Sequence, residues 1–373
     1  MHRKSNVAAR ILASTLALTL TVASAFADDG FAIRAKRVHT GDGAVIDDGV
    51  VVVRDGRIVS VGTAAPEGVP VHDHKDAVII PGMVDIGVSF GAFGQLSDTA
   101  HAVQPDIDAA DAVDPLHDDF ANALADGVTS AVLVPGPQNV VAGKAVAVRT
   151  GGPMDARGLA MQPAAHTYSI GSSVRALRFR EPTSRMGSYD LMRHVIAGKE
   201  GGGMPAGTRS FVHCSDGADL QFLAREAGNA DLVVFLSGAI DTSFNLGSDA
   251  KLSVVYGPLA PASRPLSLRT PGRIAAGGHR VAFHSGGPGV PPGTLRMTAA
   301  LAVRNGFPAE SALAAITSIP AEMAGIGDRV GSIAPGKAAD LVVLSGEPLD
   351  LSSRVLDVYV GGRHVVHHST GKE

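Results

Sequence analysis

The side chains best suited to chemistry in this chain gather around residue 213 and at residue 284. His213 and Cys214 are adjacent, Asp216 follows them, and His284 lies further downstream. Imidazole, thiolate and carboxylate groups are the donors that zinc binds at about 2.0–2.3 Å. His213, Cys214 and His284 are therefore candidate zinc ligands, and a thiol beside a histidine is also the pairing that nucleophilic catalysis requires.

Two features of the sequence argue against that chemistry. Successive residues of a strand point to opposite faces, so His213 and Cys214 cannot easily bind the same ion. Ser285 follows His284, but no Gly-x-Ser-x-Gly nucleophile elbow surrounds it, so we interpret Ser285 as a loop residue. We expect a hydrogen-bonded histidine and a buried, inert thiol, with a zinc site as the alternative.

A second pair of histidines, His72 and His74, has the His-x-His spacing of metal ligands. The pair lies before the Pro81-Gly82 break and next to the apolar Val71. Alternation of polar and apolar residues predicts a strand with one solvated face. We therefore interpret both histidines as surface residues and not as ligands.

Residues 1–27 have the pattern of a signal peptide. A basic start and an apolar run lead to Ala25-Phe26-Ala27, which fits the small-x-small cleavage pattern. The alternative is an uncleaved anchor, but the apolar run is shorter than the roughly 20 residues that span a membrane. We expect export to a bacterial periplasm, a mature chain from Asp28, and no transmembrane segment in it.

Charge and cysteine content exclude some classes of partner and of fold. Loss of Arg3, Lys4 and Arg10 with the signal peptide would leave 29 basic and 36 acidic residues, a net charge of −7. With no cluster of Lys or Arg, we expect no binding to nucleic acid. Cys214 is the single cysteine, so no internal disulfide can form.

The two ends of the mature chain predict β structure. Short runs rich in Val and Ile alternate with turns, of which Arg54-Asp55-Gly56-Arg57 is a strong hairpin signal. Because residues 28–76 and 332–373 share this pattern of short strands and turns, we expect them to form one composite β-sandwich.

Residues 77–331 alternate between strand and helix patterns, which is typical of parallel βα units. Residues 159–161 are a weaker candidate for one more strand. The stronger expected strands are 78–90, 129–134, 145–149, 209–213, 231–236, 252–256 and 280–284.

The start of this region resembles a known motif. Pro81-Gly82-Met83-Val84-Asp85, with Gly87 and Ser89 after it, is similar to the Pro-Gly-x-x-Asp-x-His-x-His first strand of the amidohydrolase superfamily. Further segments resemble imidazolonepropionase-like members in the same order: 123–129, 143–148 and 336–343. The resemblance implies a (β/α)8 barrel and metal-dependent hydrolysis of a C–N bond in a cyclic amide or small peptide-like substrate.

Small, neutral residues stand where the resemblance places the metal ligands and the catalytic base. These positions are Gly87, Ser89, Ala160, Ser237 and Gly286, the last in place of an aspartate. Among the matched positions only His213 keeps an imidazole, and zinc needs three or four donors. We therefore expect no cofactor, and a weakly active or non-catalytic protein.

The expected partners follow from that interpretation. The barrel mouth could bind a small molecule, and the chain could form a homo-oligomer or pair with an intact amidohydrolase. The alternative is an active hydrolase with a rebuilt mononuclear zinc site around His213 and His284.

Overall fold

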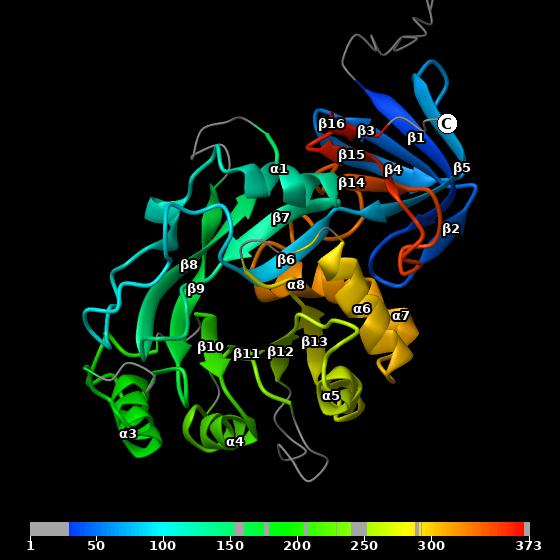
Figure 1. Ribbon diagram of the computed structural model, residues 1–373. Helices are drawn as coiled ribbons and strands as arrows, with labels where there is room; N and C mark the ends of the chain where they lie inside the picture. The colour runs from blue at the N-terminus through cyan, green and yellow to red at the C-terminus, as the bar shows by residue number, and fades with distance from the viewer. Residues whose placement is uncertain are drawn as a thin grey trace, which may run out of the picture.

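The computed structural model describes residues 30–152, 160–174, 179–204, 208–228, 230–239, 252–287, 291 and 293–368. The predicted signal peptide, residues 1–27, lies outside them. Among the helices that are described, none is long and apolar enough to cross a membrane. Figure 1 shows a sheet built from the two ends of the chain, in blue and red, beside a larger barrel built from the middle.

The first sheet, called the composite sheet here, has the order β16-β15-β14-β5-β1-β3-β4, with β2 paired to β1. Its N-terminal strands are β1 (Phe31–His39), β2 (Val45–Asp47), β3 (Val50–Arg54), β4 (Arg57–Gly62) and β5 (Val71–Pro81). Its C-terminal strands are β14 (Leu341–Leu344), β15 (Val355–Val360) and β16 (Arg363–His367). The predicted turn between β3 and β4 is present, with Asp55 and Gly56 both at positive φ.

The strand expected over 78–90 is divided at Gly82. Up to Pro81 the chain pairs with β14 in the composite sheet, and the barrel begins with β6 (Met83–Val88). A Cβ at Gly82 would lie 2.0 Å from Thr129 Oγ1, so only glycine lets these strands approach so closely. The chain is buried both from Ala77 to Pro81 and along most of β6, which is why apolar residues stand on both sides of the Pro81-Gly82 break. The composite sheet thus extends past residue 76, the limit expected for it.

The second sheet has eight strands in the order β13-β12-β11-β10-β9-β8-β7-β6, and it confirms the expected barrel. After β6 its strands are β7 (Val128–Leu133), β8 (Val141–Arg149), β9 (Ala160–Ser169), β10 (Ser210–Cys214), β11 (Leu232–Leu236), β12 (Ser253–Tyr256) and β13 (Arg280–Phe283). The weakly marked strand near 159–161 is the long β9.

One barrel strand runs against the regular (β/α)8 pattern. β8 is antiparallel to both β7 and β9. Only a short loop joins β7 to β8, and such a loop cannot carry the crossover that parallel strands need. The barrel is therefore a parallel one with a single reversed strand.

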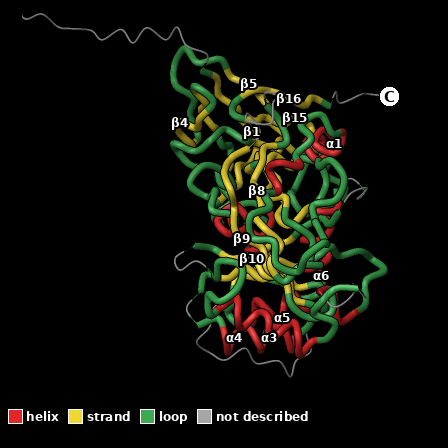
Figure 2. Tube along the Cα trace, turned by 90° about the vertical axis from the view of Figure 1, so that its left-hand side faces the viewer, coloured by secondary structure: helices red, strands yellow, loops and turns green. Residues whose placement is uncertain are grey.

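Helices cover the outer side of the barrel sheet, and Figure 2 shows α3, α4 and α5 at the end far from the composite sheet. The longer helices are α1 (Asp118–Ala125), α3 (Arg185–Ile196), α4 (Gly217–Glu226), α5 (Pro265–Ala276) and α6 (Thr294–Arg304). The short ones are the 3-10 turns η1 (Ala109–Ala112) and η3 (Ala314–Ile316), with α7 (Ala309–Ala312) and α8 (Ser318–Met323). α7 leads into η3 with only Leu313 between them.

Candidate functional site

At Gly87, where the resemblance places the first histidine, an aromatic ring lies against the backbone. Gly87 has a φ of 93° and sits where the β6–β7 register shifts. A Cβ at this position would lie 2.5 Å from Cε1 of Phe235, closer than real carbon contacts allow. Any side chain at residue 87 would therefore have to displace Phe235 from β11 and accept a strained backbone.

Phe235 belongs to an apolar cluster inside the barrel. Its ring packs edge-on against Phe211, with centroids 5.2 Å apart, and lies 5.1 Å from the imidazole of His213. Val84 and Ile86 of β6 belong to the same buried cluster. The interior below the barrel mouth is thus packed with hydrocarbon.

His213 and His284 are partly exposed, yet the protein around each imidazole lowers its pKa to about 4, chiefly by burial. His213 Nε2 lies 3.1 Å from the carbonyl oxygen of Pro135. Because a carbonyl oxygen only accepts, Nε2 carries the proton and is not free to bind a metal. His284 Nδ1 is buried without a hydrogen-bond partner among the described atoms.

Cys214 packs on the other side of β10 from the barrel interior. Its thiol is 2% exposed and lies in the outer apolar cluster with Leu220 of α4. Burial, and then the charge of Asp219, raises the pKa of the thiol well above its usual value. Asp216 accepts a hydrogen bond from Arg185 Nη1 at 3.0 Å and caps α4. The thiol is therefore protonated, and the nearby carboxylate is engaged elsewhere.

The other expected positions carry no convergent donors. Ser237 Oγ donates to the carbonyl oxygen of Cys214 at 3.2 Å. Gly286 has a φ of 110°, which favours glycine. Ser89 Oγ faces Gly287, whose Cβ would lie 3.4 Å from it. Ala160 begins β9, and its side chain lies outside the described part of the structure.

Asp85 keeps its place in the motif with a structural role. Its Oδ1 accepts a hydrogen bond from the backbone N–H of Ser285 at 3.0 Å, which ties the first barrel strand to the end of the last. Burial raises the pKa of this carboxyl to about 6. Asp85 therefore closes the barrel and does not point at Phe235 or His213.

The residues at the barrel mouth do not fit the metal that the barrel's resemblance implies. Over the described ranges, the one place where three His, Cys, Asp or Glu donor atoms lie within 4.8 Å of one another is in the composite sheet. His213, Cys214 and His284 do not form such a group. We derive no catalytic step through a metal at this position.

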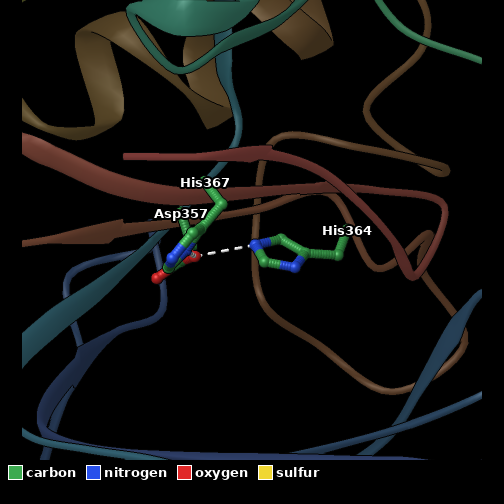
Figure 3. A group of neighbouring side chains, drawn as sticks. All are labelled: Asp357, His364 and His367. Atoms are coloured by element: carbon green, nitrogen blue, oxygen red, sulfur yellow. Dashed lines mark hydrogen bonds and ion pairs between the residues drawn. The ribbon is translucent and has the colours of Figure 1, made fainter. Parts of the chain in front are cut away.

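The composite sheet holds a group of donors that the sequence pattern did not predict. It consists of Asp357 of β15 with His364 and His367 of β16, and Figure 3 shows both imidazoles directed at the carboxylate. The sequence signal was the run of histidines at the end of a predicted hairpin. A spacing of three residues normally places side chains on opposite faces of a strand, which hid the group.

His72 and His74 also have partners that the solvated-face interpretation did not include. His72 is exposed, but its Nδ1 lies 3.2 Å from the Tyr359 hydroxyl. His74 is half-buried, with Nδ1 3.7 Å from Asp357 Oδ2. The strand face is partly solvated, as expected, and it also faces β15.

Comparisons with known proteins agree with this fold. A model of the amidohydrolase family matches residues 272–366. The chain is 36% identical over 66 residues to "Amidohydrolase tasK" of Hapsidospora irregularis, a match that covers 18% of this chain and only 7% of that protein.

Solved structures resemble the chain over most of its length. An amidohydrolase from Thermotoga maritima MSB8 is 25% identical, with a TM-score of 0.79 over 91% of this chain and 100% of that one. A molinate hydrolase is 17% identical, with a TM-score of 0.62 over 91% and 95%. The chain therefore belongs to the amidohydrolase superfamily.

Proposed function

We propose that this protein is an amidohydrolase-superfamily member whose barrel mouth no longer binds a catalytic metal, and that it acts as a binding or partner protein with little or no hydrolase activity. The observation that carries the proposal is the ring of Phe235, which takes the space of a side chain at residue 87. With the ring against this stretch of backbone, there is no room for a ligand side chain at residue 87.

Loss of the general base supports the same proposal. Metal-assisted hydrolysis needs a polarised water and a group that accepts its proton. Gly286 has no carboxylate, and His213 holds its Nε2 proton toward Pro135. Burial lowers the pKa of both His213 and His284 to about 4, so both imidazoles are neutral at pH 7.

A cavity supports the binding role. It has a volume of about 330 Å³ and runs along β6, between α1 and the start of α6. Asp85, Asp126 and Arg296 line it together with apolar side chains. This volume lies at the lower end of the range of small-molecule sites. We propose that the ligand is a small molecule bound at this side of the barrel.

One observation favours the second candidate, an active hydrolase with a rebuilt mononuclear zinc site. The Nδ1 atom of His284 is buried without a partner in the described structure, and such an atom is a potential metal ligand. This candidate needs further donors beside His284.

The two candidates are separated by metal content and turnover measured together. Untagged protein is assayed by mass spectrometry for bound zinc, and against a cyclic imide, an N-acyl amino acid and an Xaa-Pro dipeptide. We expect no hydrolysis that is sensitive to a chelator. We also expect the metal content to be the same in His213→Ala and His284→Ala as in the wild type. Zinc above half an equivalent that either variant loses, together with turnover, would establish the hydrolase instead.

Export and assembly are parts of the same proposal and have their own tests. Intact mass of protein recovered from the periplasm should correspond to a chain that begins at Asp28. Sedimentation of the mature protein, and its purification from cells that also contain an intact amidohydrolase, test the homo-oligomer and the mixed pair. A monomer that recovers no relative would remove the partner role and leave ligand binding.

A further inference from the structure

The composite sheet gathers imidazoles around one buried carboxylate. The Asp357 side chain is 3% exposed, whereas those of His364 and His367 are 40% and 63% exposed. His364 Nε2 and His367 Nδ1 each lie 2.7 Å from the same oxygen, Asp357 Oδ1. The carboxylate is thus buried in the sheet, while the two imidazoles remain reachable from solvent.

A β-bulge brings the two histidines to one face. In the β15–β16 ladder His367 pairs with Asp357 and His364 with Tyr359, and the register shifts between Val358 and Tyr359. Val365 is the extra residue of β16. Without it, His364 and His367 would point to opposite faces; bulges of this kind redirect side chains.

A third imidazole approaches from the other end of the chain. His74 Nδ1, on β5, lies 3.7 Å from the second carboxylate oxygen, Asp357 Oδ2. The ring of Tyr359 stacks on the imidazole of His364, with centroids 4.7 Å apart and an interplanar angle of 16°, and so holds that imidazole in place. The Tyr359 hydroxyl in turn contacts His72. The cluster therefore joins β5, β15 and β16.

We propose that His364, His367 and Asp357, with His74 as the fourth donor, bind one divalent transition-metal ion of the zinc type. Three imidazoles and one carboxylate are a donor set that zinc accepts in four-coordinate sites, whereas calcium and magnesium prefer oxygen donors. The site lies outside the barrel and is independent of the function proposed above.

The observed distances are compatible with such an ion after a small adjustment. Zinc bonds of about 2.0–2.1 Å at tetrahedral angles separate neighbouring donor atoms by about 3.3 Å. The imidazole nitrogens of His364 and His367 are closer than this to Asp357 Oδ1, as hydrogen bonds require. Both side chains are partly exposed, so their rings can move outward by a few tenths of an ångström. An ion there would link the two ends of the chain.

Calorimetric titration of the untagged, chelator-stripped full chain with zinc alone tests the proposal. We expect one equivalent to bind and to raise the melting temperature. Asp357→Asn and His364→Ala should weaken binding more than about 100-fold, because loss of even an outer partner of a metal site costs about 10–100-fold. Magnesium and calcium should give no binding.

Matched controls are available elsewhere in the chain. His117 lies beside Asp119 and caps α1, where its Nδ1 accepts a hydrogen bond from the Asp119 backbone N–H. His117→Ala therefore removes a histidine next to a carboxylate outside the cluster and should leave zinc binding unchanged. His213→Ala should also leave it unchanged. If Asp357→Asn fails to fold, His364→Gln replaces it, with circular dichroism as the check of folding.

Two results would overturn the proposal. One is the absence of zinc binding by the wild-type chain, which would make the cluster a hydrogen-bonded carboxylate only. The other is zinc that remains bound in His364→Gln and Asp357→Asn. Zinc lost only on His213→Ala would contradict both this site and the metal-free barrel, whereas zinc lost only on Asp357→Asn leaves the barrel proposal intact.

Discussion

The barrel mouth and the composite sheet differ in how polar side chains are arranged. At the mouth, where related barrels would need metal ligands, Gly87 makes room for Phe235 and the interior is hydrocarbon. In the composite sheet, His364 and His367 surround the buried Asp357. The comparison teaches that a fold indicates where a site belongs, but the local packing decides whether donors can meet there.

The largest effect should come from a single methyl group at the barrel mouth. Gly87→Ala places a Cβ 2.5 Å from Phe235 and strains a backbone with a φ of 93°. Overpacking costs about 1–3 kcal/mol and a left-handed backbone about 1–2 kcal/mol, so we expect a loss of about 3 kcal/mol in the free energy of unfolding. Urea denaturation measures it.

Gly94 is the matched control for that substitution. Its φ is 71°, and a Cβ there would meet nothing within 4 Å. Gly94→Ala should therefore cost only the backbone strain, about 1–2 kcal/mol. Equal losses for the two variants would show that Phe235 does not occupy the space of a side chain at residue 87.

The next effect concerns Asp85, whose pKa is raised to about 6 from 3.8. Between these values the folded state binds more protons than the unfolded state, so ionisation of Asp85 lowers stability as pH rises. Asp85→Asn removes that loss and can still accept from Ser285. We expect a gain of up to about 3 kcal/mol at pH 8, which shrinks to about half at pH 5.

Thermal unfolding at the two pH values measures this difference, with the exposed Asp328→Asn as control.

His213 and His284 change the pH dependence of stability in the opposite direction. Their pKa values are lowered to about 4 from 6.5, so the unfolded state binds more protons in that range and stability falls with acid. The free energy of unfolding should therefore fall more steeply with decreasing pH in Asp85→Asn than in the wild type. An unchanged dependence on pH would contradict the burial of the Asp85 carboxyl.

A smaller effect is expected in the composite sheet without metal. Asp357→Asn exchanges a charged acceptor shared by His364 and His367 for a neutral one, which should cost about 1–2 kcal/mol. Chemical denaturation in the presence of chelator measures it. A loss as large as that of Gly87→Ala would mean that the cluster is chiefly a structural hydrogen-bond centre.

The smallest effect should come from Tyr359→Phe. The substitution removes the hydroxyl contact with His72 and keeps the ring that stacks on His364. A net hydrogen bond is worth about 0.5–1.5 kcal/mol, and this one is partly exposed, so we expect the low end of that range. Zinc affinity should not change, and a marked fall would show that the hydroxyl helps to orient the cluster.

Much of the fold could be predicted because its signals are local. The Pro81-Gly82 break, the Asp55-Gly56 turn and the buried apolar runs each report on a few neighbouring residues. The direction of β8 was not predicted, because an apolar run is the same for parallel and antiparallel strands; the short loop before it was the signal that could have indicated a reversed strand. The break at Gly82 was indicated, but residues 78–90 were expected as one strand because the chain is buried on both sides of it.

The site was less predictable because it depends on contacts between distant residues. The resemblance directed attention to Gly87, but the sequence could not show that the ring of Phe235 lies against it. The grouping of His364 with His367 depends on a bulge at Val365, which strand periodicity does not predict. The approach of His74 depends on how the two ends of the chain meet.

The meeting of the two ends in one sheet has a consequence for the order of folding. His72 and Tyr359 are 287 residues apart, so their contact closes one of the longest loops in the chain. Contacts of such separation form slowly, because the entropy of loop closure must be overcome before they contribute stability. The histidine cluster should therefore assemble after the barrel. An ion bound there would leave the rate of refolding unchanged and slow the rate of unfolding.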